Sequence, residues 1–340
     1  MRRPHPNPRP LAGKGITRRN RLGAPPPPQA AEGGGGGFGA ADDPNDIHPG
    51  DWVDRYLPAW AEPYARLARW DRPIGTWLLL FPSWWGICLA GPFWPNLRLM
   101  ALFAVGAFVM RGAGCTLNDI ADRDYDGRVA RTRMRPIPSG RVTVRQAMLF
   151  MHAQLAIGAL VLLSLNNATK GLGVFVLALI TTYPYMKRYT YWPQLFLGLN
   201  FNWGVLMGWT AVTGSLAWPP VLLYLGGICW TLGYDTIYAH QDKEDDARIG
   251  VKSSALALGD RTRPFLFVFY GGAVVLWGAA AIVADMDLVF WDGLFIVAVQ
   301  LVWQAATVDT SDAGDCLVKF KSNRIVGWVL LGAIVAGHVL

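Results

Sequence analysis

The stretch Arg111-Gly-Ala-Gly-Cys-Thr-Leu-Asn118-Asp119-Ile-Ala-Asp122-Arg-Asp124-Tyr-Asp126 joins an apolar segment directly to an acidic one. The apolar part begins near residue 97 and is long enough to cross a bilayer, which takes about 20 residues. In lipid it must be a helix, because only a helix satisfies its own backbone polar groups. If this helix continues into the acidic part, Asn118, Asp122 and Asp126 lie on one face, one turn apart.

The composition of the whole chain agrees with the interpretation of this segment as a transmembrane helix. Of 340 residues, 52% are hydrophobic and only 16% are charged, and the mean hydropathy is +0.25. Soluble chains carry about a quarter charged residues, so a soluble globular protein is excluded. The 16 tryptophans fit helices that end at two membrane interfaces, where indole rings are enriched. The four cysteines are scattered and are interpreted as small buried hydrophobic residues.

Apolar segments of spanning length follow one another along the chain. They predict an all-α integral membrane protein, a bundle of nine transmembrane helices around a central cavity. The expected spans are 74–92, 97–117, 143–165, 169–187, 196–213, 218–237, 264–284, 288–307 and 325–340.

The loops indicate the orientation. Lysine and arginine gather in every even-numbered loop, which the positive-inside rule places in the cytoplasm. We therefore attribute the net charge of +7 to topology and to the basic N-terminus, and we expect no nucleic-acid partner. The loop cations are Arg123, Arg128, Arg131, Arg133, Arg135 and Arg141; Lys187 and Arg188; Lys243, Arg248, Lys252, Arg261 and Arg263; and Lys319, Lys321 and Arg324.

Three regions are expected. Residues 1–50 are rich in Pro and Gly and basic, which predicts a disordered tail. Residues 51–73 form an amphipathic entry segment at the interface, and residues 74–340 form the transmembrane domain. The prolines of the tail oppose the amphipathic helix of a transit peptide, so we expect a cell inner membrane, with the mitochondrial inner membrane as the alternative.

A second acidic stretch follows the sixth span and contains Asp235, Asp242 and Asp246 at spacings of seven and four. In a continuous helix these residues share one face. Two carboxylates about 5 Å apart repel by roughly 3 kcal/mol at an effective dielectric of 20. A shared cation relieves this repulsion, and all-oxygen ligands favour Mg²⁺. The alternative is that both acidic loops are simply solvated.

Cations accompany the carboxylates. Arg111 lies seven residues before Asn118, inside the apolar span, where an ionisable residue is a functional candidate unless it reaches the interface by snorkelling. Arg131, Arg133 and Arg135 could hold phosphate oxygens or could serve only as topology signals. Carboxylate-bound Mg²⁺ and arginines at the mouth of an apolar bundle would receive an anionic head on an apolar tail. A prenyl diphosphate has this chemistry.

The same residues resemble a known family. Asn118-Asp119-x-x-Asp122-x-x-x-Asp126 and Asp242-x-x-x-Asp246 are similar to the two Asp-rich motifs of the UbiA family of membrane prenyltransferases. The resemblance extends over roughly 66–340 and is strongest to the branch that prenylates 4-hydroxybenzoate for ubiquinone. The segments that carry it are Arg72-Pro-Ile-Gly75, Met110-Arg-Gly-Ala-Gly-Cys115, Arg135-Pro-Ile-Pro-Ser-Gly140, Tyr183-Pro-Tyr-Met-Lys-Arg-Tyr-Thr190, Tyr234-Asp-Thr-Ile-Tyr-Ala239 and Ile249-Gly-Val-Lys-Ser253.

The resemblance implies site residues and a reaction. Arg188, with Lys187 beside it, would bind the carboxylate of an aromatic acid, although alone this pair also fits a topology signal. The enzyme would use Mg²⁺ to move a polyprenyl group from polyprenyl diphosphate to the carbon ortho to the hydroxyl of 4-hydroxybenzoate. Asp122 and Asp235 are both candidates for the base that removes the ring proton. The residues that would hold Mg²⁺ and the diphosphate are Asn118, Asp122, Asp126, Asp242 and Asp246.

Two other functions remain open from the sequence. A prenyltransferase of the same family with haem or a naphthoate as acceptor would carry the same acidic motifs. A divalent-cation transporter is the alternative without catalysis, but that class places carboxylates near the middle of the bilayer. Here the nearest carboxylate, Asp235, lies at the cytoplasmic end of its span.

Overall fold

The computed structural model describes residues 47, 50–91, 95–128 and 132–338, and within these ranges the chain is helical without a strand. The expectations for residues 1–46 therefore lie outside the described part. The helices are α1 (Trp52–Tyr56), α2 (Glu62–Leu67), α3 (Ile74–Ala90), α4 (Leu97–Asp126), α5 (Val144–Leu163), α6 (Asn167–Tyr189), α7 (Pro193–Thr213), α8 (Trp218–Ala239), α9 (Lys243–Ile249), α10 (Ser254–Leu258), α11 (Thr262–Val283), α12 (Leu288–Thr307) and α13 (Ala313–Ala336), with 3₁₀ turns η1 (His240–Asp242) and η2 (Gly259–Arg261).

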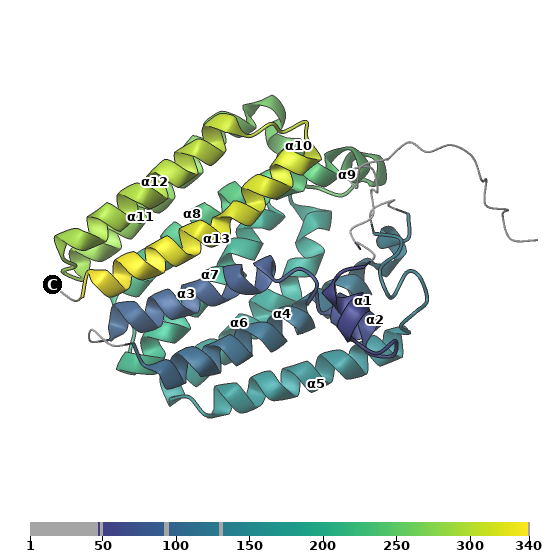
Figure 1. Ribbon diagram of the computed structural model, residues 1–340, viewed down its shortest axis with the longest axis horizontal. Coiled ribbons are helices and arrows are strands. Elements are labelled where there is room, and N and C mark those ends of the chain that lie inside the picture. Colours follow the sequence, from purple (N-terminus) through teal and green to yellow (C-terminus); the bar gives the residue numbers. More distant parts are fainter. Residues whose placement is uncertain (1–46, 48–49, 92–94, 129–131, 339–340) are drawn as a thin grey trace, which may run out of the picture. The chain divides into compact units, whose positions relative to one another are not determined.

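Nine helices of 17 residues or more form the bundle in the described part, in agreement with the sequence prediction. The long helices run alongside one another, as Figure 1 shows. Five segments in these ranges meet a strict criterion of length and apolarity for crossing a membrane: α4, α5, α7, α12 and the stretch Ser254–Val283 that contains α10 and α11. The others are shorter or carry more polar residues.

One predicted boundary is wrong. The last span was expected from residue 325, but α13 begins at Ala313, so Lys319, Lys321 and Arg324 lie within the helix and not in a loop. Its first turns are polar yet stabilised: Asp312 caps the helix, and Lys319 Nζ pairs with Asp315 Oδ1 at 3.1 Å. Lys319 Nζ also lies 4.1 Å from the ring centroid of Trp303. Hydropathy alone misses a helix end that side-chain pairing stabilises.

Several tryptophans form the centre of the bundle, not its interfaces. Trp85, Trp230 and Trp277 are fully buried and lie against one another, with ring centroids 5.4 to 6.0 Å apart. Each indole N–H has a partner, for example Trp85 Nε1 with the carbonyl of Gly327 at 3.1 Å. A buried indole without such a partner would lose a hydrogen bond, so these pairings also fix the ring positions.

Helices α3 and α7 approach so closely that only glycine fits at their contact. A Cβ atom on Gly86 would lie 2.2 Å from the carbonyl oxygen of Val205, and one on Gly208 would lie 2.2 Å from that of Ser83. Small residues allow such backbone contact in membranes, where dispersion replaces the hydrophobic effect between helices.

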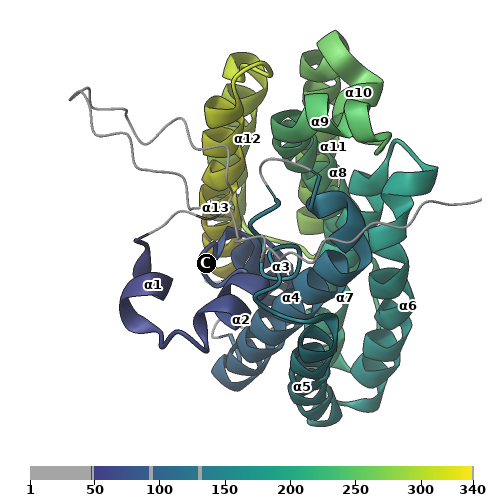
Figure 2. The same cartoon turned by 90° about the vertical axis from the view of Figure 1, so that its right-hand side faces the viewer.

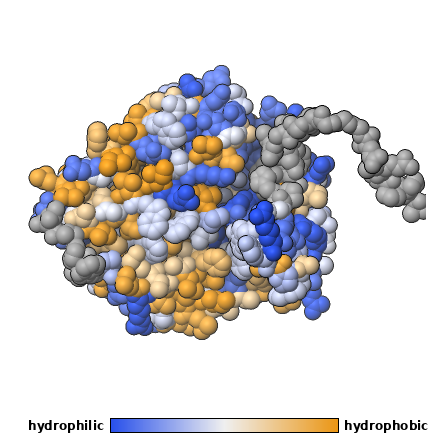
Figure 3. Space-filling view, in the orientation of Figure 1, coloured by the Kyte–Doolittle hydropathy of each residue, from blue (hydrophilic) through white to orange (hydrophobic). Residues whose placement is uncertain are grey.

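Large apolar side chains remain exposed on the outer helices. They include Leu149, Leu160 and Leu163 of α5, Val174 and Phe175 of α6, and Phe295 and Val299 of α12. On the side of the molecule that Figure 3 shows, apolar residues cover much of the surface, while hydrophilic residues gather over α1 and α2. Such a surface is suited to lipid and not to water, so the chain is a multi-pass membrane protein.

The short helices lie together at one end of the bundle. Figures 1 and 2 place α1, α2, α9 and α10 at that end, whereas α13 finishes at the opposite one. Helices α1 and α2 fall in residues 51–73, the segment expected to lie at the interface.

Candidate active site at one end of the bundle

Helix α4 carries the first acidic motif. It runs unbroken from Leu97 to Asp126, which confirms that the helix continues beyond its apolar part. The carboxylate groups of Asp122 and Asp126 are buried, with 1% and 7% of each residue exposed, whereas the Asp124 side chain is 73% exposed. The helical spacing thus separates the buried acidic face from the solvated Asp124, as predicted.

Three cations converge on this face. Arg135 Nη1 donates to Asp126 Oδ2 at 3.0 Å. Lys187 Nζ donates to Asp122 Oδ2, and Arg188 Nη2 lies 4.0 Å from Asp122 Oδ1. Cations from the loop after α4 and from the end of α6 therefore balance carboxylates that would otherwise be buried without compensation.

The second acidic segment is not one continuous α-helix, so the helix that was predicted to run unbroken through Asp235, Asp242 and Asp246 is wrong. Helix α8 ends at Ala239, the turn η1 contains Asp242, and α9 contains Asp246. A 3₁₀ turn advances 120° per residue instead of 100°, which breaks the periodicity. The buried His240 holds this turn, since its Nε2 lies 2.9 Å from Thr262 Oγ1, and burial together with nearby Lys243 lowers its pKa to about 4.

Hydrogen bonds connect the two acidic segments through the end of α6. The backbone N–H of Val251 donates to the carbonyl of Asp246 at 3.0 Å, and that of Lys252 donates to the carbonyl of Lys187 at 2.9 Å. Lys252 Nζ also donates to the carbonyl of Tyr189 at 3.1 Å. The Lys187 ammonium pairs with Asp122. Lys187 therefore contacts both the chain after α9, through its carbonyl, and the acidic face of α4, through its side chain.

A second polar group lies deeper in the bundle. Asp235 of α8 interacts electrostatically with Arg111 of α4, and both also act on Tyr183 of α6. Arg111 is half-buried above the ring of Phe201 at 5.5 Å. Gly75 makes room for it, because a Cβ there would lie 2.5 Å from Arg111 Nε. Asp235 thus lies within electrostatic range of Arg111.

The α4 donors suit a hard divalent cation. Asn118, Asp122 and Asp126 offer only oxygen ligands, and the buried Asp122 Oδ1 has no hydrogen-bond partner within the described residues. An orphaned buried oxygen of this kind favours a positive ligand. Among the described residues no three His, Cys, Asp or Glu side chains gather closely enough to hold a metal by themselves. Asp242 and Asp246, half-buried across the end of α6, are the further donors that the motifs predict.

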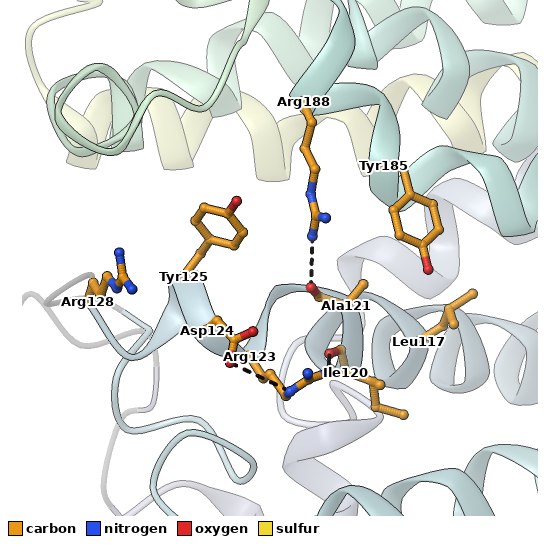
Figure 4. A pocket seen from close by; sticks show the side chains of 9 residues that line it. All are labelled: Leu117, Ile120, Ala121, Arg123, Asp124, Tyr125, Arg128, Tyr185 and Arg188. Carbon is orange, nitrogen blue, oxygen red and sulfur yellow. Dashed lines mark hydrogen bonds and ion pairs between the residues drawn. The ribbon is translucent and has the colours of Figure 1, made fainter.

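A pocket of 450 Å³ adjoins these carboxylates on the α4–α6 side. Figure 4 shows Arg188 reaching down from α6, where its Nη2 donates to the carbonyl of Ala121 at 2.9 Å. Its guanidinium carbon lies 5.3 Å from the ring centroid of Tyr125 and 5.5 Å from that of Tyr185. Asp122 and Asp126 do not line this pocket. Of the three cations that converge on the acidic face of α4, only Arg188 also lines the pocket.

The structure also adds two residues that received no role from the sequence. Asp119 is fully buried, and Arg69 Nη2 donates to its Oδ1 at 2.7 Å. Asp119 precedes Asp126 by seven residues, so the helical periodicity could have placed both on one side. No local pattern identifies Arg69. Arg131, a predicted phosphate ligand, lies outside the described residues.

Comparisons with known proteins agree with this architecture. The family model of the UbiA prenyltransferase family matches residues 79–330. The chain is 48% identical over 295 residues to a protein of Arabidopsis thaliana, covering 86% of this chain and 72% of the relative. It is also 48% identical over 287 residues to one of Drosophila melanogaster, covering 84% and 73%. Both relatives are named 4-hydroxybenzoate polyprenyltransferase, mitochondrial.

Solved structures show the same fold. A UbiA homolog from Aeropyrum pernix superposes with a TM-score of 0.67 at 27% identity, covering 78% of this chain and 98% of that one. A UbiA homolog from Archaeoglobus fulgidus bound to GPP and Mg²⁺ gives a TM-score of 0.60 at 18% identity, covering 82% and 100%. The nine-helix bundle, the two acidic segments at one end and these similarities together show that the chain belongs to the UbiA prenyltransferase family.

Proposed function

We propose that the protein transfers a polyprenyl group from polyprenyl diphosphate to 4-hydroxybenzoate, at the carbon ortho to the hydroxyl, in ubiquinone biosynthesis. The observation that carries this proposal is the convergence of Arg135, Lys187 and Arg188 on buried carboxylates at the end of an apolar bundle. That arrangement suits an anionic head whose long apolar tail stays in lipid. The names of the relatives support the acceptor.

The acidic motifs provide the site for Mg²⁺ and diphosphate. Asn118, Asp122, Asp126, Asp242 and Asp246 would hold the metal, and the Archaeoglobus structure with GPP and Mg²⁺ supports a metal in this fold. When bound, Mg²⁺ neutralises charge on the leaving diphosphate. Arg135 and Lys187, which pair with Asp126 and Asp122, reach the same place and would bind the phosphate oxygens. Arg131 is proposed for the same role.

Arg188 is the proposed ligand of the aromatic carboxylate. A planar guanidinium suits bidentate carboxylate binding, and Tyr125 and Tyr185 flank it in the α4–α6 pocket. Its distance of 4.0 Å from Asp122 Oδ1 places it between this pocket and the acidic face. The acceptor would thus bind next to the diphosphate.

In the reaction, the C1–O bond of the prenyl diphosphate breaks, and its electron pair leaves with the diphosphate. The ring carbon ortho to the hydroxyl attacks C1, and a base then takes the proton from that carbon. We favour Asp235 as this base over Asp122, because Asp122 already pairs with Lys187, whereas Asp235 lies within α8, in electrostatic range of Arg111. The surrounding aromatic residues would exclude the water that could capture the allylic cation.

The relatives also bear on the location. Since both are named mitochondrial, they favour the mitochondrial inner membrane over the cell inner membrane.

The purified protein in liposomes tests the proposal. With Mg²⁺, a polyprenyl diphosphate and 4-hydroxybenzoate, mass spectrometry should detect prenylated 4-hydroxybenzoate together with equimolar diphosphate. Prenylated haem or naphthoate, formed in its place, would refute the acceptor. Divalent-cation flux across the liposomes without any diphosphate release would refute the transferase and support a transporter.

A further inference from the structure

The segment before the first long helix forms a cap on the site, which we call the N-terminal cap (residues 51–72). Arg66 is its centre: only 1% of the side chain is exposed, and it is surrounded by carboxylates. Buried arginine with several partners fixes geometry more than it adds stability. The partners of Arg66 are Asp51 at 3.1 Å, Asp54 at 2.5 Å, Glu62 at 2.5 Å and Asp71 at 3.8 Å.

The cap presents one arginine to α4. Arg69 follows α2 with a φ of 59°, a left-handed conformation that side chains other than glycine rarely adopt. Its Nη1 donates to the carbonyl of Arg66 at 2.9 Å, and its Nη2 donates to Asp119 Oδ1 at 2.7 Å. A strained backbone that aims a charged side chain at a fully buried partner is typical of a functional constraint.

Asp119 connects the cap to the candidate phosphate ligand. Its Oδ1 is shared, since Arg135 Nη1 lies 3.4 Å from it and 3.0 Å from Asp126 Oδ2. The charges therefore alternate from Arg69 through Asp119 and Arg135 to Asp126. Asp119 belongs to α4, and Arg135 lies 16 residues later, in the loop that follows this helix.

The charge balance explains why Arg69 matters. A fully buried carboxylate without Arg69 would pull Arg135 toward itself and away from Asp126, because an uncompensated buried charge is costly. With Arg69 bound to Asp119, the Arg135 guanidinium is held between the two carboxylates. We propose that Arg69 and Asp119 are positioning residues, through which the N-terminal cap sets the guanidinium of Arg135 for the diphosphate. This inference rests on the proposed function of Arg135.

The test compares Arg69→Gln, Arg69→Lys, Asp119→Asn and the double variant Arg69→Gln/Asp119→Asn. Two quantities are measured: the KM of each substrate, and the Kd of a non-reactive prenyl thiolodiphosphate, followed by tryptophan fluorescence. Each neutralising single variant should raise both the KM for prenyl diphosphate and this Kd about tenfold, and leave the KM for 4-hydroxybenzoate within about twofold. Arg69→Lys should retain more binding than Arg69→Gln. The double variant should bind better than Arg69→Gln alone, because it no longer contains a buried carboxylate at position 119 that draws Arg135 away from Asp126.

Asp315→Asn is the matched control. It breaks another largely buried ion pair, Lys319–Asp315, in α13, a helix that carries no proposed ligand of the metal or the substrates, so it reports general destabilisation. Its two KM values and its Kd should stay unchanged. Equal changes in both KM values in the Arg69 and Asp119 variants, or an unchanged Kd, would overturn the inference. If the unaltered protein binds the thiolodiphosphate but never prenylates 4-hydroxybenzoate, the proposed acceptor fails, while the Kd series still decides the role of Arg69 and Asp119.

Discussion

Replacing Asp122 by asparagine separates catalysis from folding. The change keeps the shape of the side chain and removes the charge that faces Lys187 and Arg188. At the 4.0 Å between Asp122 Oδ1 and Arg188 Nη2, the attraction is ~4 kcal/mol at an effective dielectric of 20. The cost of burying the carboxylate is of similar size and opposite sign, and the Lys187 and Arg188 side chains that remain are 26% and 36% exposed, so that water can solvate them. The free energy of unfolding should therefore change by only about 1 kcal/mol.

Catalysis should suffer far more than folding. Removing one preorganised electrostatic partner of a leaving group typically lowers kcat by a factor of about 10² to 10³. The assay is prenylation of 4-hydroxybenzoate in liposomes, with protein insertion and melting temperature measured on the same samples. Glu244→Gln is the control, because this exposed carboxylate of α9 lies outside the α4–α6 pocket and contacts Arg248 at 3.8 Å. Its kcat should stay within about twofold of the unchanged protein. Comparable activity of the Asp122 and Glu244 variants would refute the role of the acidic face.

Three further changes probe other parts of the site. Gly75→Ala should lower kcat by displacing the Arg111 guanidinium, since a Cβ would lie 2.5 Å from its Nε; normal kcat would contradict a role that depends on the present position of this guanidinium. Arg188→Ala should raise the KM for 4-hydroxybenzoate about tenfold and the KM for prenyl diphosphate far less, and equal effects would remove its carboxylate role. His240→Gln should reduce the fall of the melting temperature as the pH is lowered. The wild-type histidine binds a proton near pH 6.5 when unfolded and only near pH 4 when folded, so it costs up to about 3 kcal/mol as the pH falls across that window. An unchanged pH profile of the melting temperature in His240→Gln would contradict this.

The sequence predicts the local parts of the site well. Periodicity alone placed Asn118, Asp122 and Asp126 on one helical face and Asp124 away from it, because a helix repeats every 3.6 residues whatever lies around it. The same assumption failed after α8, where the buried contact of His240 with Thr262 imposes a 3₁₀ turn. That contact joins residues 22 apart and leaves no local pattern.

The long-range parts could not be predicted. Arg69 donates a hydrogen bond to Asp119, which lies 50 residues later in the chain. The backbone N–H of Lys252 donates to the carbonyl of Lys187, although α7, α8 and α9 lie between them in the sequence. The sequence did not predict that Trp85, Trp230 and Trp277 cluster in the core. A high tryptophan content is expected both for a packed core and for helices that end at membrane interfaces. Pairings of this kind depend on how the helices pack, which periodicity does not specify.

The central claim is that acidic residues of α4 and of the segment after α8 bind one divalent cation together with the diphosphate. Titration with Mn²⁺, followed by the EPR signal of the free ion in the presence of prenyl thiolodiphosphate, measures this directly. Asp122→Asn and Asp246→Asn should each weaken Mn²⁺ binding by at least about tenfold, and Glu244→Gln, which changes an exposed carboxylate of α9, should leave it unchanged. Mn²⁺ affinity that is lost in only one of the two acidic variants, or in neither, would contradict a shared site.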